Sequence, residues 1–134
     1  MVKVEDFKFN MELETVTAYD SKNKKTVKYY NVPCSFDIET SSTEVSSNKF
    51  AFMYEWTLGI KSPQYFCYSR TLDSFLKLCD KLIETYNLSL ENRLIIYVHN
   101  LSYEFQFMRK FFKWDKLFAV DERKPIKAVT INGI

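Results

Sequence analysis

Apolar and polar residues alternate along two stretches of the chain, and alternation of this kind predicts β-strands. Residues 34–40 place their apolar side chains on one side and two carboxylates on the other. Residues 49–60 repeat the pattern with aromatic side chains, and residues 64–68 make a third strand after a short turn. Because short turns join antiparallel neighbours, we expect these three strands to form an antiparallel sheet.

The spacing of apolar residues becomes helical farther along the chain. Over residues 72–86 it predicts an amphipathic helix, and Thr71 is suited to cap its start. Residues 94–98 form a continuous apolar run, as in a strand that is buried on both faces. A second helix is expected over residues 103–112.

The remaining segments are read from turn residues and shorter apolar patterns. We expect a β-hairpin from residues 11–19 and 26–30, with a polar turn between its strands. Residues 40–48 are rich in Ser and Thr and are expected to form a loop. Two short strands are expected within residues 116–134, joined near residues 121–125.

The order of these elements indicates a fold class. Three antiparallel strands come first, and a helix then crosses over to a strand that can lie parallel to the first strand. This is an α/β arrangement with a mixed sheet and flanking helices, the layout of a ribonuclease-H-like domain. In that layout Asp37 and Glu39 would lie at a cleft near residues 100–104.

Composition limits the classes of function. The chain has 134 residues, enough for one domain with a single core, and 46% of them are apolar. Aromatic residues reach 17%, so most of them must lie in the core, while some Tyr and Phe remain candidates for stacking on bases. The net charge of +2 excludes a strong overall field for DNA or membranes. Any nucleic-acid site must therefore be local.

The cysteine and histidine content excludes a zinc signature. Cys34, Cys67 and Cys79 have no metal-binding spacing, and the chain has one histidine. The pattern is typical of reduced core cysteines in an intracellular protein. The sequence shows no signal-peptide core and no apolar run long enough to span a bilayer. We therefore expect a cytoplasmic protein without a membrane partner.

The two carboxylates of the first strand are candidates for metal binding. Residues i and i+2 of a strand point the same way, so Asp37 and Glu39 share one face. At roughly 6 Å and an effective dielectric constant of about 20, their repulsion is on the order of 2–3 kcal/mol. A divalent cation between them would reverse that cost. The alternative is a solvated face of an edge strand.

Two short motifs carry a resemblance to a known family. Residues 36–40, Phe-Asp-Ile-Glu-Thr, resemble the first exonuclease motif (DxE) of the 3′–5′ proofreading domain of family B DNA polymerases. Residues 97–105 resemble the second motif, which reads His-Asn-Leu-x-aromatic-acid in the protein-primed phage branch. The chain thus resembles the exonuclease domain of a protein-primed phage-type family B DNA polymerase over residues 34–134. Residues 1–33 then look like an N-terminal extension with a β-hairpin.

The resemblance implies a DnaQ-like exonuclease fold and a catalytic site. Asp37, Glu39 and Glu104 match the metal-binding carboxylates of a two-metal site that uses Mg²⁺ or Mn²⁺ to hydrolyse single-stranded DNA 3′ ends. Glu104 stands where most members of the branch have Asp. Its additional methylene moves the carboxylate by roughly 1.5 Å.

The resemblance also implies a set of residues that hold the single-stranded 3′ end of DNA. These are Thr40, Tyr97, His99, Asn100, Tyr103 and Phe107. Amide and imidazole groups suit sugar or phosphate, and aromatic faces suit bases. Structural alternatives remain: Asn100 as a helix cap, His99 bonded to a main-chain carbonyl, and Tyr103 and Phe107 packed in the core.

The chain departs from the family after Glu104. The family's third motif, a Tyr several residues before a last catalytic Asp, has no counterpart, because neither Asp115 nor Asp121 has the right spacing. The polymerase palm is also absent. We therefore expect an N-terminal fragment of a polymerase, or a truncated stand-alone relative, with an incomplete two-metal site and an open sheet edge. The isolated chain is then expected to be a weak or inactive exonuclease. The remaining polymerase chain or another subunit would be a partner, in the cytoplasm of a bacterial host if the gene is phage-encoded.

Three functions fit these observations. The first is the proofreading exonuclease part of a phage-type DNA polymerase. The second is a catalytically deficient, nuclease-derived module for DNA binding or regulation. The third is a different ribonuclease-H-like nuclease in which Asp115 or Asp121 completes the site.

Overall fold

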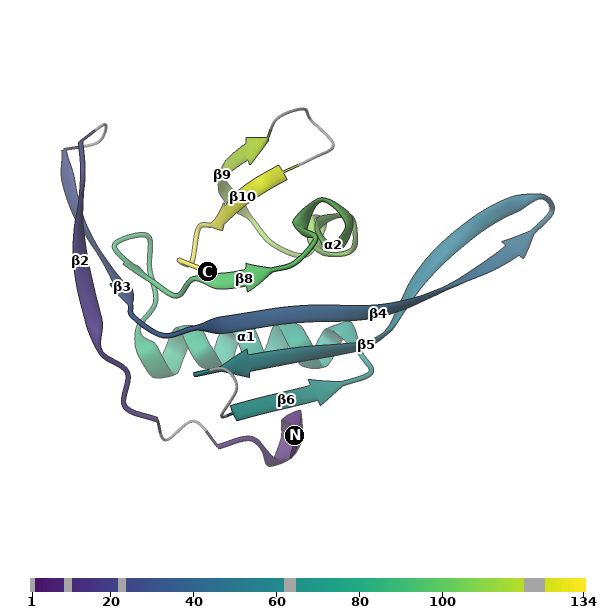
Figure 1. Cartoon of the computed structure of the whole chain (residues 1–134), viewed down its shortest axis with the longest axis horizontal. Coiled ribbons are helices and arrows are strands. Elements are labelled where there is room, and N and C mark those ends of the chain that lie inside the picture. Colours follow the sequence, from purple (N-terminus) through teal and green to yellow (C-terminus); the bar gives the residue numbers. More distant parts are fainter. Residues whose placement is uncertain (1, 9–10, 22–23, 62–64, 120–124) are drawn as a thin grey trace.

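A mixed five-stranded sheet forms the centre of the molecule (Figure 1). The structure is a computed structural model, and it describes the chain except for residues 1, 9–10, 22–23, 62–64 and 120–124. The strands lie in the order β1 (Val2–Lys3), β6 (Tyr65–Ser69), β5 (Asn48–Ile60), β4 (Cys34–Val45) and β8 (Ile96–Val98). β4 and β6 run antiparallel to β5, and β8 runs parallel to β4. The predicted order of three antiparallel strands followed by a parallel one is confirmed.

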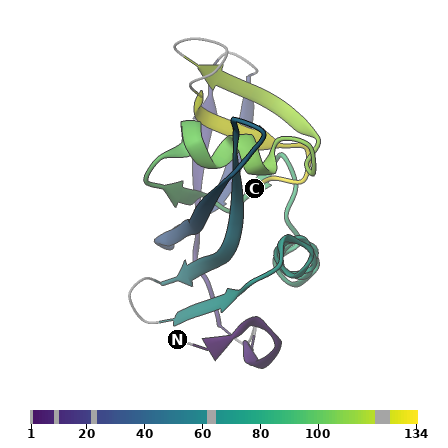
Figure 2. The same cartoon turned by 90° about the vertical axis from the view of Figure 1, so that its right-hand side faces the viewer.

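Helix α1 (Leu72–Tyr86) covers one face of this sheet (Figures 1 and 2). Its Phe75 ring lies 4.5 Å from the ring of Phe36 and 5.2 Å from that of Trp56, measured between centroids. The predicted cap is confirmed, because the Thr71 side chain accepts a hydrogen bond from the Ser74 N–H. The Trp56 indole N–H donates to the Thr71 carbonyl at 2.7 Å, which ties the helix start to β5.

The opposite face of the sheet is open at β8. Ile96 packs against the core, whereas Tyr97 is 66% exposed. The prediction that residues 94–98 form a strand buried on both faces is therefore wrong. The reason is that β8 is an edge strand and α1 shields only one of its faces.

The predicted N-terminal hairpin is confirmed as β2 (Thr15–Asp20) and β3 (Lys25–Tyr30). The short strand β7 (Asn92–Arg93) pairs with β3 and makes a second, three-stranded sheet. The Tyr30 hydroxyl donates to the Tyr86 carbonyl at 2.8 Å. The hairpin is thus joined to the end of α1.

The segment before β2 also belongs to the main body. A short 3₁₀ helix, η1 (Val4–Asp6), follows β1, and β1 pairs with β6. Phe7 and Val32 are buried in the same core as the main sheet. Residues on both sides of position 33 therefore share one core.

The second helix, α2 (Leu101–Met108), begins and ends earlier than the expected span of residues 103–112. The expected strands near the C-terminal end are confirmed as the antiparallel pair β9 (Trp114–Ala119) and β10 (Pro125–Thr130). Most of the expected junction between them lies outside the described residues. Within the described part of the chain, no helix has both the length and the apolar character needed to cross a membrane.

β4 and β5 continue past the sheet as a two-stranded ribbon, which we define as residues 40–45 and 48–53 (Figure 1). The prediction of a Ser/Thr-rich loop at residues 40–48 is therefore wrong. The ribbon closes through Ser46 and Ser47, whose φ angles are 51° and 66°. Positive φ at both central residues suits a tight hairpin turn, but Asn-Gly is the usual signal for it.

Candidate active site

Two acidic side chains meet where β4 leaves its neighbour β8. β8 pairs with β4 only as far as Phe36, so from Asp37 onward this edge of β4 has no neighbouring strand in the part of the chain that the structure describes. α2 starts directly after β8 and lies beside this free edge (Figure 1). Asn100 caps α2, because its side-chain oxygen accepts a hydrogen bond from the Tyr103 N–H at 3.3 Å. The cap role of Asn100 is thus confirmed, and it fixes the first turn that carries Glu104.

The carboxyl group of Glu104 is buried, and the residue is only 3% exposed. Among the described residues, its Oε2 atom has no hydrogen-bond partner. Burial raises the pKa of Glu104 to about 8, and the neighbouring Asp37 carboxylate adds to this increase, while a hydrogen bond from the Ile38 backbone acts in the opposite direction. Near neutral pH the metal-free protein therefore holds a proton on Glu104, beside the Asp37 carboxylate.

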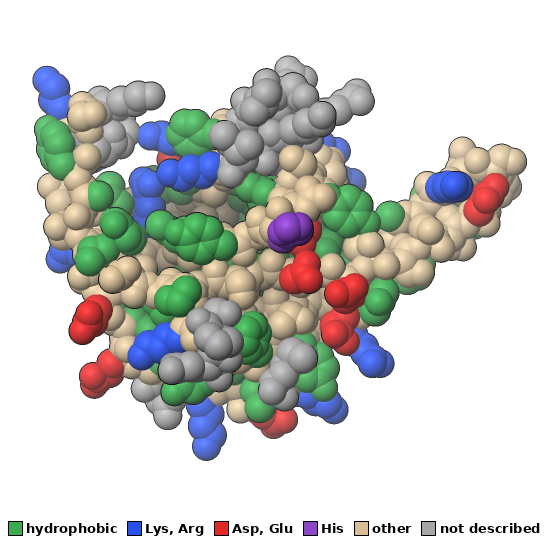
Figure 3. All heavy atoms as spheres, viewed as in Figure 1, with side chains coloured by type: hydrophobic (Ala, Val, Ile, Leu, Met, Phe, Trp, Pro, Cys, Tyr) green, Lys and Arg blue, Asp and Glu red, His purple; other side chains and the backbone are tan. Residues whose placement is uncertain are grey.

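Asp37 and Glu39 are both exposed on the open face of β4. Glu39 lies directly across from Glu55 of β5, whose carboxylate is 3.8 Å from the Arg70 guanidinium nitrogen Nε. Figure 3 shows acidic side chains gathered on this face next to the single histidine. Sequence reasoning missed Glu55, and the strand register is what places it opposite Glu39.

The donor set fits one divalent cation better than two. Mg²⁺ and Mn²⁺ accept carboxylate oxygens as ligands. The carboxyl groups of Asp37 and Glu104 lie side by side, and among the described residues the Glu104 Oε2 atom has no hydrogen-bond partner. In the described part of the chain, no group of three or more His, Cys, Asp or Glu side chains is arranged to hold a metal. Glu39 shares the face with Asp37 but is not gathered into such a group.

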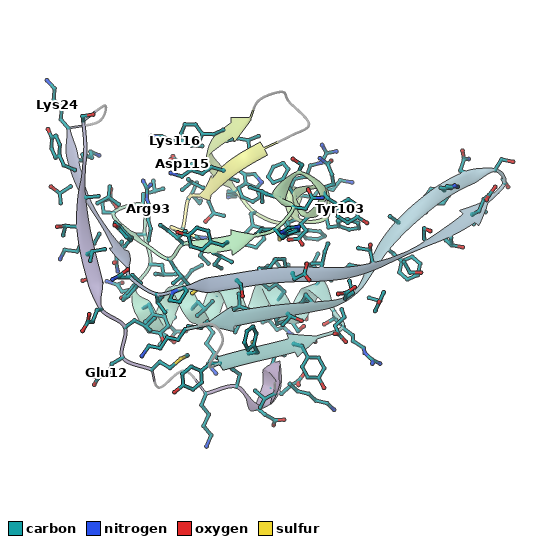
Figure 4. All side chains as sticks on the ribbon, in the orientation of Figure 1. Glu12, Lys24, Arg93, Tyr103, Asp115 and Lys116 are labelled. Carbon is teal, nitrogen blue, oxygen red and sulfur yellow. The ribbon has the colours of Figure 1, made fainter. Side chains whose placement is uncertain are left out.

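Three of the predicted substrate-binding residues lie together at the junction of β4 and α2. The hydroxyl groups of Thr40 and Tyr103 are hydrogen-bonded at 2.7 Å, and Figure 4 shows Tyr103 on α2. The Tyr103 and Phe107 rings meet edge to face, with centroids 5.3 Å apart. Phe107 also packs against the hydrophobic core, as its structural alternative predicted. Tyr103, in contrast, keeps an exposed ring.

Two further predicted substrate-binding residues, Tyr97 and His99, lie on β8 and directly after it. Tyr97 is across from Ser35 and therefore shares the open face with Asp37. His99 is exposed in the turn between β8 and α2. Both side chains are open to solvent near the site.

The structure does not bring Asp115 to the carboxyl pair. Asp115 is exposed on β9 and lines a separate hollow with Arg93 and Lys116 (Figure 4). Asp121 lies outside the described residues. The third hypothesis therefore has no geometric support from Asp115.

Comparisons with protein-family models, with curated proteins and with solved structures find no match to this chain. The resemblance of residues 36–40 and 97–105 to exonuclease motifs therefore stands on those residues alone. The geometry adds one independent fact, namely that the two segments meet at Asp37 and Glu104.

Proposed function

We propose that this chain carries a 3′–5′ exonuclease site, in a ribonuclease-H-like fold, that acts on the single-stranded 3′ end of DNA. One observation carries the proposal: the carboxyl groups of Asp37 and Glu104, one from each motif, meet at the free edge of β4. The strand order β6-β5-β4-β8, with α1 as the crossover, supports the fold. In this proposal the protein works in the cytoplasm of a bacterial host.

The carboxyl pair is the proposed metal site. Asp37 and Glu104 would hold Mg²⁺ or Mn²⁺, which when bound supplies positive charge for activating water and for stabilising the leaving 3′ oxygen. With a cation held there, Glu104 would be ionised and its proton lost to solvent, because a nearby positive charge lowers the pKa of a carboxyl group. Glu39 extends the acidic face next to this pair.

The surrounding residues position the DNA end. The exposed Tyr103 ring offers a stacking surface for a base, and its hydrogen bond to Thr40 fixes its orientation. His99 offers an exposed imidazole for a phosphate or sugar oxygen at the start of α2. The Asn100 amide oxygen is used in the helix cap, so its amino group is the part left for the substrate.

A nuclease assay with matched variants tests the proposal. Single-stranded DNA labelled at its 5′ end is incubated with the protein and Mn²⁺, and we expect slow, stepwise shortening from the 3′ end, because among the described residues the site lacks part of a two-metal ligand set. Asp37→Asn and Glu104→Gln should abolish the shortening, whereas Glu44→Gln, which changes an exposed acid of the same strand, should leave it intact. Shortening that survives Asp37→Asn would show that the nuclease activity is not due to this site.

Calorimetry tests the metal site separately from activity. We expect wild-type protein to bind one Mn²⁺ weakly, since two adjacent carboxyl groups provide few ligands. Asp37→Ala should lose this binding and Glu44→Gln should keep it. Equal Mn²⁺ binding by wild type and Asp37→Ala would remove the metal assignment.

A DNA-binding module with little or no catalysis is the second candidate. It is favoured by the absence of a group of three metal-binding side chains among the described residues. Fluorescence anisotropy with single-stranded DNA and EDTA separates binding from digestion, and binding should weaken as salt rises. Tyr103→Ala should weaken binding by about 1–3 kcal/mol if the ring stacks a base. Tyr19→Ala, which removes an exposed ring from the hairpin, is the control.

A further inference from the structure

The ribbon projects away from the body of the molecule (Figure 1). Every residue from Ser41 to Phe52 is exposed, including Phe50 at 54% and Phe52 at 47%. A two-stranded sheet alone is only marginally stable in water. A further strand at its edge would therefore stabilise the ribbon.

The outer backbone edge of β5 is free along the ribbon. β6 pairs with β5 only at residues 56–60, so residues 48–54 have no neighbouring strand on that side within the described part of the chain. Edge strands of natural proteins are usually protected by charges, prolines or bulges. Residues 50–53, Phe-Ala-Phe-Met, contain neither a charge nor a proline.

The chemistry of the ribbon favours a protein partner over a nucleic acid. Its charged side chains are Glu44 and Lys49, which lie directly across from each other and balance in charge (Figure 3). Binding to a phosphate backbone depends on several cationic side chains. A free backbone edge with apolar side chains instead fits another β-strand.

We propose that residues 48–54 of β5 pair with the same residues of a second copy of this chain. The two edges would run antiparallel about a two-fold axis at Ala51, so the contact is isologous and closes as a dimer. In this register Phe50 of each copy lies across from Phe52 of the other, and Lys49 lies across from Met53. No like charges face each other, and two aromatic pairs form, which are favourable cross-strand contacts.

The same register gives the dimer a continuous sheet. Residues that are cross-strand partners share a face, so Phe50 and Phe52 lie on the same face as their β4 partners Thr43 and Ser41. The strand order would become β4-β5-β5-β4 across the two copies. Stable protein–protein interfaces bury about 1,200–2,000 Å² of surface, and the pairing of two seven-residue strand edges is a small contact by comparison. The dimer should therefore be weak and should depend on protein concentration.

Analytical ultracentrifugation of the full chain tests the proposal. We expect wild type to shift from monomer toward dimer as concentration rises into the micromolar range. The double variant Phe50→Lys/Phe52→Lys should remain monomeric, because it removes the aromatic pairs and places lysines opposite each other. Ser41→Lys/Thr43→Lys is the matched control, since it adds the same charge to the same face on the other strand, and it should still dimerise.

Cross-linking tests the register without disturbing the strand. Ala51→Cys places two thiols across the two-fold axis, where paired Cα atoms about 4.5–5.5 Å apart fit the geometry of a disulfide. The native thiols of Cys34, Cys67 and Cys79 are buried, and burial raises the pKa of each to about 12. Mild oxidation should therefore give a covalent dimer of Ala51→Cys. Ser42→Cys, the partner of Ala51 on β4, should give none.

Three results would overturn the proposal. A wild-type protein that stays monomeric up to high micromolar concentration has no such contact. Efficient cross-linking through Ser42→Cys instead of Ala51→Cys would place the interface on β4. Open-ended aggregation in place of a dimer would contradict a closed two-fold pairing.

Discussion

The same two strands, β4 and β5, are a core at one end and a solvent-exposed ribbon at the other. In the inner half, Trp56, Leu58 and Ile60 are fully buried under α1. In the outer half, Phe50 and Phe52 are exposed although they too are apolar. Alternating apolar residues therefore predict that a strand forms, but they do not predict that anything covers it.

A change of register separates the two halves. β5 contributes one extra residue between the pairs Glu39–Glu55 and Thr40–Met53, which makes a bulge at Tyr54. Because the side-chain period of a strand is two, this residue moves Phe50 and Phe52 to the face opposite Trp56. The site lies at this boundary, since Thr40 contacts Tyr103 there.

The largest expected effect is a difference in the free energy of unfolding between variants of the inner half and variants of the outer half of β5. Leu58→Ala should lower the free energy of unfolding by about 2–5 kcal/mol, because it opens a cavity under α1. Phe52→Ala should change the free energy of unfolding of the monomer by no more than about 0.5 kcal/mol. Urea unfolding at low protein concentration measures both. A similar loss from both variants would mean that the ribbon is packed in solution.

The second prediction concerns pH at the boundary between the halves. The pKa of Glu104 in the folded protein, about 8, lies above its ordinary value of 4.5, so the folded state binds more protons between these values. The contribution of Glu104 to the free energy of unfolding is therefore fully present below pH 4.5. It is lost as pH rises to about 8, with a slope of up to about 1.4 kcal/mol per pH unit.

Two variants isolate this contribution to stability. Glu104→Gln keeps the shape of the side chain and removes its titration, so its unfolding free energy should stay flatter than that of wild type over this pH range. Asp37→Asn removes the neighbouring negative charge and should reduce only part of the pH dependence of the unfolding free energy. The reason is that burial contributes more than Asp37 to the raised pKa of Glu104. Identical pH profiles for Glu104→Gln and wild type would contradict the assignment.

The third prediction concerns the open face of the inner half. A Cβ atom at Gly59 would lie 2.6 Å from a Phe66 ring carbon and 2.8 Å from the Ser35 Oγ. Gly59→Ala should therefore cost about 1–3 kcal/mol of stability through overpacking. Gly59→Ala combined with Phe66→Ala should recover part of this loss relative to the sum of the two single variants. Strict additivity would show that the ring does not cover Gly59.

The smallest expected effect is at the link between β4 and α2. Thr40→Val removes the hydroxyl that is hydrogen-bonded to Tyr103 and should cost about 0.5–1.5 kcal/mol. Tyr103→Phe should cost a similar amount, and the double variant should cost little more than either single one. Thermal unfolding measures these differences, and independent effects would argue against the hydrogen bond.

Local sequence determined most of the elements and one part of the site. The spacing of residues 72–86 and the cap at Thr71 predict α1, because a helix is stabilised by nearby residues. Asn100 could likewise be identified as a cap for α2 from its position after an apolar run. The two motifs identified Asp37 and Glu104 as site candidates, but not that burial would raise the pKa of Glu104.

Only the tertiary structure decided which surfaces are covered and how the strands are registered. The bulge at Tyr54 and the open side of Tyr97 depend on pairing between residues that are farther apart in the chain. A strand pattern with period two is compatible with either face being buried, and one inserted residue exchanges the faces. The pairing of β4 with β8 stops at Phe36 and leaves room for Glu104 beside Asp37, which no local pattern in the sequence encodes.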